Sequence, residues 1–391
     1  MKYNNLIIFY VFAIVLLLGC FTIVKDPKEI STIENRHLKK IPHLTNSEYF
    51  YKNFQKNFEQ ALNDQFIYSD KIKKNYNKYT NISNHIAIDK YLCRNNYISI
   101  DSGHSLYGCD GYIVYNYSSY GNISDRELSM FFEGYNKLNS IKEVYYYTID
   151  TSNVYDFNSK KNTFNLEENF KKHLKGNYKI QSFKFNSFEE YSNYFYKTDH
   201  HWNYKGSYKG YKEIMNMMGI KDVKVPVKTI TLDNIKYYGS HVQLTRYLKT
   251  YDVFKAYSFN LEKHDTFING KPSKYGNADF YISEKREKEK DMTNMYSEYY
   301  GNDYGEIIFD YHNNKENILI LSNSYDNAID ELIASHFNRT YILDFRKFDN
   351  HNFNLVDYMN KNKINKVLVI ADYFYLKDNL TLKKEWLDGI Q

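Results

Sequence analysis

The sequence predicts an α/β fold in which helices cover a sheet of buried strands. Apolar runs typical of buried strands recur in the C-terminal third, at 318–321, 341–343 and 367–370. Helical patterns near 328–333 and 354–361 separate these runs. The chain of 391 residues is also long enough for one large domain with a substantial core. Such alternation of strands and helices is the pattern of a layered α/β sheet.

Composition narrows the functional class. The 52 basic and 47 acidic residues are spread along the chain, giving a net charge of +5 without a concentrated basic stripe. We therefore expect no binding to nucleic acid. Only 4 prolines and 16 glycines are present, which argues against long disordered linkers. We interpret the 43 tyrosines as the codon bias of an A/T-rich, bacterial genome, although tyrosines also line sugar clefts.

The N-terminus predicts attachment to a membrane. Residues 3–24 carry no charge, and their apolar run is long enough for a helix across a bilayer. We expect residues 1–24 to form a signal anchor, with the body of the protein extracellular and tethered to the cell membrane. Leu17-Leu18-Gly19-Cys20 also resembles a lipoprotein cleavage site, so a lipid anchor at Cys20 is the alternative. A polar stalk is predicted over 25–46.

The single predicted domain covers 47–391. Phenylalanines and leucines spaced by four predict an amphipathic helix pair over 47–79, and the tight-turn signal Gly108-Cys109-Asp110-Gly111 predicts a β-hairpin region over 86–116. Cys93 and Cys109 flank part of that region and are candidates for a disulfide in an oxidising compartment.

The middle of the domain continues the alternation. Ser124-Asp125-Arg126-Glu127 is a capping box that opens a helix ending near Ser140. Further elements are predicted as a strand at 144–149, a helix at 166–174, a strand at 179–185 and a helix at 206–218. The region 221–314 shows no clear periodicity and is interpreted as insert-like.

A dense polar cluster stands between two of these elements, at Asp199-His200-His201-Trp202. An Asp two residues before a His, on extended or turning backbone, sends both side chains to the same side. Asp199 is therefore placed to orient His201 as a base.

A candidate nucleophile follows the strand at 318–321, in Ser322-Asn323-Ser324. Sites in α/β sheets gather where strands end and helices begin, and helix N–H groups there stabilise an oxyanion. A serine at a helix start is also a common cap, which is the structural alternative. With the Asp/His cluster, Ser324 predicts an acyl-transfer triad of Asp199, His201 and Ser324.

The segment from Lys197 to Asn203, Lys-Thr-Asp-His-His-Trp-Asn, resembles the signature of the bacterial DHHW family. That family is related to the SGNH-like alginate O-acetylation proteins AlgJ and AlgX. Shorter pieces occur in the family's order along most of the chain. They are Glu34-Asn35-Arg36, Phe58-Glu59, Asn63-Asp64-Gln65-Phe66, Gly108 to Tyr112, Tyr238-Gly239-Ser240 and the strand, serine and helix block at Ser324.

The resemblance implies a circularly permuted, SGNH-hydrolase-like three-layer sandwich, because the Asp and His precede the Ser. It implies that Ser324 carries an acetyl group to a hydroxyl of an exported polysaccharide. The acetyl source is expected to be a membrane-bound O-acyltransferase of the MBOAT type, and no soluble cofactor or metal is expected. Cellulose-like, uronic-acid and cell-wall polymers all stay open as the acceptor.

Two departures from the family pattern bear on these expectations. Relatives carry Gly-Asp-Ser where this chain has Ser322-Asn323-Ser324, which affects the loop geometry and the oxyanion hole. The chain also ends at Gln391 without room for the extra carbohydrate-binding module of AlgX, so an AlgJ-like architecture is expected.

Five further residues are candidates for oxyanion or substrate contacts: Gly239, Ser240, Asn323, Lys197 and Trp202. Trp202 either stacks on a sugar or packs beside the site, and Lys197 either binds ligand or is solvated. His200 is interpreted as a structural hydrogen-bonding residue, with an alternative base as the other possibility.

Three rival functions are also considered. The first is a carbohydrate acetylesterase with water as the acceptor. The second is a non-catalytic glycan-binding scaffold of an export or acetylation complex, suggested by the altered serine block. The third is a metal-dependent phosphoesterase with ligands from Asp199-His200-His201. That last function is disfavoured because the additional paired aspartates it needs are missing.

Overall fold

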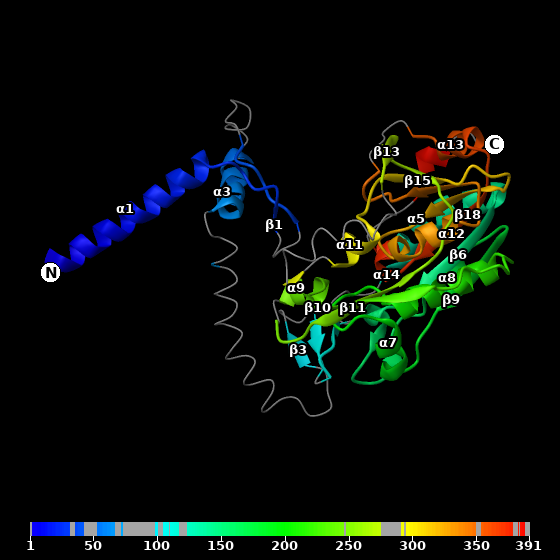
Figure 1. Cartoon of the computed structure of the whole chain (residues 1–391), viewed down its shortest axis with the longest axis horizontal. Helices are drawn as coiled ribbons and strands as arrows, with labels where there is room; N and C mark the ends of the chain where they lie inside the picture. The colour runs from blue at the N-terminus through cyan, green and yellow to red at the C-terminus, as the bar shows by residue number, and fades with distance from the viewer. Residues whose placement is uncertain are drawn as a thin grey trace. The chain divides into compact units, whose positions relative to one another are not determined.

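The computed structural model describes most of the chain. The described residues are 2–31, 36–42, 53–66, 72, 98–100, 105–108, 110–116, 123–245, 248–274, 291–292, 295–348, 353–377, 382 and 384–387. They fall into two compact units, Met1–Leu92 and Cys93–Gln391 (Figure 1). The sequence prediction placed the start of the main domain at residue 47. Cys93 and Cys109 lie outside the described residues, so their disulfide stays a prediction.

The first unit begins with helix α1, Lys2–Val24, which covers the segment predicted as an anchor. Many of its apolar side chains are exposed, including Leu6 and Phe21. Within the described ranges, no helix has the length and apolarity that crossing a membrane requires. The anchor and the lipid attachment at Cys20 stay predictions.

A helix and a two-stranded ribbon are also described in this unit. Strands β1 (Ile30–Ser31) and β2 (Arg36–His37) pair antiparallel, and helix α3 spans Asn53–Gln65 within the predicted helix pair. The Gln65 amide accepts from Lys28 N at 2.8 Å and donates to Lys28 O and Lys39 O. Asp64 accepts from Lys39 N at 2.9 Å. The end of α3 therefore satisfies the backbone polar groups of the segments around the ribbon.

The second unit is built on an eight-stranded sheet of order β13-β12-β15-β17-β16-β18-β6-β9. Five neighbouring strands, β17 to β9 in that order, are parallel, and the remaining three add antiparallel at one edge. The parallel strands are β6 (Glu143–Ile149), β9 (Tyr178–Phe183), β16 (Asn317–Leu321), β17 (Arg339–Leu343) and β18 (Ile364–Ala371). These are the strands that the sequence predicts, with small shifts at their ends.

Both faces of this sheet are buried. Alternate residues of β18 divide between two apolar clusters, with Leu368 and Ile370 in one and Val367 and Val369 in the other. The first cluster includes side chains of α7 (Phe188–Tyr194), α8 (Tyr204–Met217) and α12 (Asp330–Ala334). The second includes side chains of α5 (Asp125–Ile141), α6 (Leu166–His173), α13 (Leu355–Lys361) and α14 (Tyr373–Lys377). The result is a three-layer sandwich, as predicted (Figure 1).

The region 221–314, in which the sequence shows no clear periodicity, contributes strands to two sheets. Strands β12 (Asp265–Ile268), β13 (Lys271–Ser273) and β15 (Glu306–Asp310) extend the main sheet. Strands β10 (Lys228–Tyr237), β11 (Asp252–Ser258) and β14 (Asp291–Met292) form a separate small sheet. Helices α9 (Ser240–Thr245) and α11 (Met295–Tyr300) accompany them, and α11 packs on the small sheet in a third apolar cluster.

The predicted hairpin region is a three-stranded antiparallel sheet in its described part. It consists of β3 (Ile98–Ile100), β4 (Ser105–Tyr107) and β5 (Ile113–Tyr115). Short elements η4 (Ser152–Val154), β7 (Tyr155–Asp156) and β8 (Lys161–Asn162) follow β6.

The capping box of α5 forms as predicted. Ser124 Oγ accepts from Glu127 N at 3.3 Å, and the Glu127 carboxylate accepts from Ser124 N at 2.7 Å. An N-cap serine commonly contributes about 1 kcal/mol to stability. We expect Ser124→Ala to lower the free energy of unfolding by about 1 kcal/mol, measured by urea denaturation. Ser140→Ala at the other end of the helix is the control, and an equal loss in both variants would contradict this role of the cap.

Asp150 stands at the carboxyl end of β6 and is buried, with an exposed fraction of 4%. Its Oδ1 atom has no hydrogen-bond partner among the described residues. Burial raises the pKa of Asp150 to about 7, against a lowering by the Lys184 charge. The folded state therefore holds this carboxyl neutral at a pH where the unfolded chain has lost the proton.

We expect Asp150→Asn to stabilise the protein more at pH 8 than at pH 5. An acid whose pKa is raised by folding destabilises the folded state increasingly as pH rises from about 4 to 7, and asparagine removes that cost. The expected difference is on the order of a few kcal/mol, read from urea midpoints at the two pH values. Exposed Asp233→Asn is the control. A gain that is the same at both pH values would show that ionisation of Asp150 is not its source.

Candidate active site

The polar cluster predicted from the sequence lies in a closed loop between α7 and α8. Phe195 and Trp202 form an antiparallel bridge at the base of the loop. Asn203 N donates to Tyr194 O at 2.8 Å, and the Asn203 side chain caps α8 by accepting from Lys205 N and Gly206 N. The loop ends are thereby held, so the residues between them project from a defined backbone.

Trp202 anchors this loop in the core. The indole is fully buried and packs edge-on against Phe183 and Tyr325 at centroid distances of 5.8 and 5.7 Å. A Cβ added at Gly210 of α8 would lie 2.6 Å from the indole ring, so this packing needs a glycine. Packing is therefore the role that the structure gives Trp202. The alternative of stacking on a sugar does not fit, because the ring has no exposed surface.

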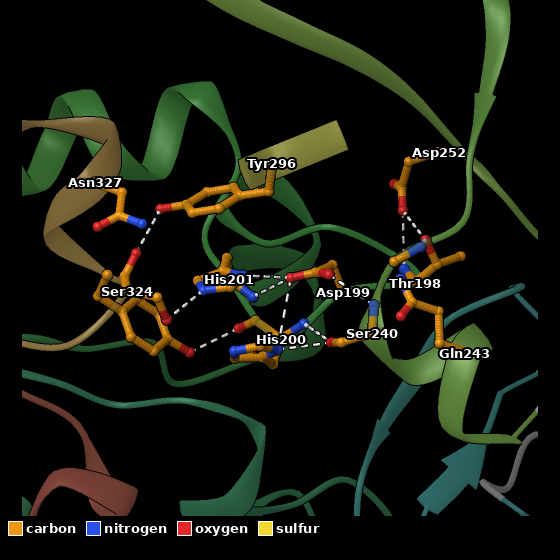
Figure 2. A network of polar contacts seen from close by, with 12 residues as sticks. Thr198, Asp199, His200, His201, Ser240, Gln243, Asp252, Tyr296, Ser324 and Asn327 are labelled. Atoms are coloured by element: carbon orange, nitrogen blue, oxygen red, sulfur yellow. Dashed lines mark hydrogen bonds and ion pairs between the residues drawn. The ribbon is translucent and has the colours of Figure 1, made fainter. Parts of the chain in front are cut away.

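Asp199, His201 and Ser324 lie in one continuous hydrogen-bonded row (Figure 2). Asp199 Oδ1 accepts from His201 Nδ1 at 2.6 Å and from His201 N at 3.0 Å. On the other side of the ring, His201 Nε2 lies 2.8 Å from Ser324 Oγ. Since the Nδ1 proton points at the carboxylate, the Nε2 lone pair faces the serine hydroxyl. This arrangement orients a base on a nucleophile that is itself partly exposed.

The electrostatics keep Asp199 ionised. Burial alone would raise the pKa of this carboxyl, but His201, His200 and the hydrogen bonds from His201 hold it well below its usual value. Asp199 Oδ2 also accepts from Ser240 N at 2.7 Å. A buried carboxylate with these donors stabilises a positive charge on the imidazole beside it.

His200 contacts Ser240 rather than Ser324. Its Nδ1 lies 2.6 Å from Ser240 Oγ, and its carbonyl accepts from the Tyr325 hydroxyl at 2.7 Å. Burial, reinforced by His201, holds the pKa of His200 well below its usual value, so this ring is neutral. The structure therefore gives His200 and Ser240 a hydrogen-bonding role beside Asp199.

Gly239 permits the close approach of two chain segments. A Cβ at this position would lie 2.4 Å from Asp199 Cβ and 2.5 Å from Thr198 O. Distances below about 3 Å are excluded for real side chains, so only glycine lets Ser240 N reach Asp199. Gly239 and Ser240 thus contact the aspartate of the row, on the side away from the His201–Ser324 contact.

Asp252 holds the backbone of the loop at Lys197 and Thr198. Its carboxylate accepts from Lys197 N and Thr198 N, each at 2.9 Å, and from the Thr198 hydroxyl. The ammonium of Lys197 lies over the ring of Tyr112, 5.7 Å from the centroid. Lys197 therefore has an aromatic partner rather than a contact with Ser324. Sequence reasoning missed Asp252, which is separated from the loop by more than fifty residues.

Ser324 follows β16 on a turn that its neighbours hold in place. The Asn323 amide donates to Asp372 Oδ1 at 2.9 Å and accepts from Tyr325 N at 3.3 Å. Both ends of this amide are engaged, so the structure places Asn323 as a loop brace. An aspartate at 323 would instead face the buried carboxyl group of Asp372.

Tyr296 of α11 is a second residue that sequence reasoning missed. Its ring stacks on His201 with a centroid distance of 3.9 Å and an interplanar angle of 7°, and its hydroxyl donates to Ser324 O at 3.2 Å. Figure 2 shows Tyr296 and His200 on opposite sides of the His201 ring. The imidazole is therefore held in its plane, and nothing in the pattern of a tyrosine-rich sequence singles out this tyrosine.

Asp199, His200 and His201 are the one group of metal-ligating side chains found in the described part of the chain, with donor atoms within 4.8 Å of one another. Ligand atoms on a tetrahedral ion at about 2.0–2.2 Å lie roughly 3.3 Å or more apart. Asp199 Oδ1 and His201 Nδ1 are only 2.6 Å apart. These two atoms share a proton and cannot both bind one metal ion.

Comparison with known proteins gives the fold. No family model and no curated protein sequence matches the chain. PatB1 of Bacillus cereus, solved with a sulfonyl adduct, aligns with a TM-score of 0.53 and 22% identity over 71% of this chain and 95% of its own. A DHHW family protein from Eubacterium siraeum aligns with a TM-score of 0.52 and 20% identity, over 74% and 99%. This mixed α/β sheet is therefore shared with the proteins that the sequence motif indicated.

The O-acetyltransferase domain of Pseudomonas putida AlgJ is a weaker match. It has a TM-score of 0.39 and 10% identity over 73% of this chain and 95% of that domain.

We expect Gly239→Ala to disable the row without unfolding the protein, because the new methyl group would clash with Asp199 and must displace it from the position in which it orients His201. The readout is the rate at which a sulfonyl fluoride labels Ser324, followed by intact mass. We expect a fall of at least about tenfold, the effect of losing a barrier contribution near 1.4 kcal/mol. Gly19→Ala, where nothing lies within 4 Å of the new atom, is the control. Unchanged labelling in Gly239→Ala would show that the row does not activate Ser324.

Proposed function

We propose that this protein is an extracytoplasmic O-acetyltransferase that carries acetyl on Ser324 to a hydroxyl of an exported polysaccharide. The supporting observation is the unbroken contact from Asp199 through His201 to Ser324, with distances of 2.6 and 2.8 Å. A serine hydroxyl is a weak nucleophile until an adjacent base takes its proton. Here base and hydroxyl are already within hydrogen-bonding distance.

In the first half of the reaction, Ser324 Oγ attacks the carbonyl carbon of the acetyl donor. His201 Nε2 takes the hydroxyl proton, and Asp199 stabilises the imidazolium that forms. The tetrahedral intermediate collapses, the bond to the donor breaks, and the leaving group takes the proton from His201. The product is an acetyl ester on Ser324.

In the second half, a sugar hydroxyl replaces the leaving group. It gives its proton to His201 as its oxygen attacks the ester carbonyl of the acyl-serine. The bond between the acetyl carbon and Ser324 Oγ then breaks, and Oγ recovers its proton from His201. Stacking of Tyr296 on His201 keeps the same ring orientation for both halves.

Further support comes from the chain's similarities. The fold is shared with PatB1, which was solved with a sulfonyl adduct, and such adducts form when an activated nucleophile attacks the sulfur of a sulfonyl reagent. The motif Asp199-His200-His201-Trp202 resembles the signature of the DHHW family, a member of which also shares the fold. We propose membrane attachment through the N-terminal segment, and an MBOAT-type membrane protein as the acetyl source.

An acetylesterase would use the same residues with water as the acceptor. Both reactions pass through the acyl-serine, so only the rate of the second half separates them. A transferase loses its acetyl group faster when an oligosaccharide acceptor is added, whereas an esterase does not.

We expect Ser324→Ala to abolish acetyl-enzyme formation with an activated acetyl ester. It should also lower transfer to an oligosaccharide by at least roughly a thousandfold, the usual cost of losing a serine nucleophile. Intact mass measures the acetyl-enzyme, and mass spectrometry of the sugar measures transfer. Ser322→Ala is the matched control, because Ser322 Oγ contacts only the backbone oxygen of Asn323 in the described structure.

The scaffold alternative makes the opposite prediction. If Ser324→Ala left polymer acetylation in cells unchanged, while the wild-type protein formed no acetyl-enzyme, the proposed catalytic function would be wrong.

A further inference from the structure

A cavity of about 780 Å³ lies beside the candidate active site, within the second unit. Its volume falls in the range of small-molecule sites, roughly 300–1,000 Å³. It is bounded by the ends of β11 and β12, the loop between them, α11, η5 (Asp326–Ala328) and α12. Asp199, His201 and Ser324 do not line it, so the function proposed above leaves this cavity unexplained.

The cavity shares two elements with the catalytic row. On α11, Tyr296 stacks on His201, while Tyr299 and Tyr300 line the cavity. On the other element, Asn327 follows shortly after Ser324 and also lines the cavity. Figure 2 shows Asn327 close to Ser324 and Tyr296. A ligand bound here therefore lies against the same two elements that hold the base and the nucleophile.

Aromatic side chains and carboxylates dominate the walls. Among the described lining residues, five are carboxylates and two are lysines. The flat aromatic walls that suit a sugar ring or a cation come from Tyr257, Phe259, Tyr299, Tyr300 and Tyr304. This composition favours a ligand that is partly apolar, rich in hydrogen-bonding groups and positively charged.

Glu331 supplies the most specific contact. The exposed fraction of its side chain is 27%, and its carboxylate lies 3.4 Å from His264 Nε2. No lysine or arginine of the described residues lies within 4.0 Å of that carboxylate. Burial raises the pKa of Glu331 to about 7, as expected for a carboxyl without a cationic partner.

The Nε2 atom of His264, which faces Glu331, is a hydrogen-bond acceptor. Its Nδ1 lies 3.2 Å from the backbone oxygen of Glu262, so Nδ1 carries the proton. Burial lowers the pKa of His264, which leaves the ring neutral and Nε2 unprotonated. Stacking on Tyr311 at 4.6 Å holds the ring in this position. When Glu331 is ionised, two acceptors, Nε2 and the carboxylate, face each other at the cavity wall, and one donor with several N–H groups satisfies both.

We propose that this cavity binds a sugar unit carrying a free amine, with its ammonium group donating to Glu331 and His264 and its ring against the tyrosines. The proposal rests on the proposed function in one respect, since it makes an amino-sugar polymer the acceptor. Neutral sugars lack the charge that Glu331 requires, and N-acetylated sugars have lost it.

The test compares three tetrasaccharides on the full-length protein by isothermal titration calorimetry. They are a glucosamine tetramer, its N-acetylated form and a glucose tetramer. We expect the glucosamine tetramer to bind at least about tenfold more tightly than the other two. Glu331→Gln should reduce that preference to less than about threefold, whereas Glu316→Gln, an exposed carboxylate that pairs with Lys366, should leave it unchanged.

Equal affinity for the three tetramers, or no binding of the glucosamine tetramer, would overturn the inference. Because this ligand comparison uses the wild-type protein, it stands even if Glu331→Gln fails to fold.

Ser324→Ala separates the two proposals, since Ser324 does not line the cavity. It should keep the preference for the amine and lose acetyl transfer. If Ser324→Ala still transferred acetyl groups, only the catalytic proposal would be wrong. If the wild-type protein transferred acetyl groups but showed no preference for the amine, only the amino-sugar proposal would be wrong.

Discussion

The buried carboxylate of Asp199 constrains the structure around it, because neighbouring segments must supply its hydrogen-bond donors. An ionised group at this depth is stable only when donors surround it, and three residues from two parts of the chain provide them or make room for them. His201 donates from its backbone and its ring, Ser240 donates from its backbone, and Gly239 clears the space between. The chain after β10 therefore meets the loop after α7 because a charge has to be satisfied there. Orientation of the base follows from the same contacts.

The sheet brings the nucleophile to this point. β16 lies between β17 and β18 among the five parallel strands, and Ser324 follows its carboxyl end as Asp372 follows that of β18. Carboxyl ends of parallel strands meet at one edge, so residues distant in sequence become neighbours. The base arrives separately, on a loop closed by Phe195 and Trp202. A rigid sheet edge and a closed loop thus hold two groups that are 123 residues apart at hydrogen-bonding distance.

Much of this was predictable because it depends on local pattern. The capping box before α5, the buried strands and the spacing of Asp199 and His201 are each visible within a short window of sequence. The antiparallel strands β12, β13 and β15 were not predictable, since their short segments lack a distinctive period. Tyr296 and Asp252 were also missed. Their roles arise from contacts across many residues, and one tyrosine among 43 has no distinguishing mark. For Trp202 the sequence left two alternatives, packing beside the site and stacking on a sugar. Only the tertiary structure, which buries the ring, decides for packing.

The contact between Asn323 and Asp372 has a consequence for sequence variation in this protein. An amide and a carboxylate form a matched donor and acceptor, whereas two carboxylates at 2.9 Å would repel each other. Asp372 also accepts from Tyr375 N, so it cannot turn away freely. The two positions are therefore expected to tolerate change together rather than singly. Asn323 is then half of a matched pair, and the other half, Asp372, follows the end of β18.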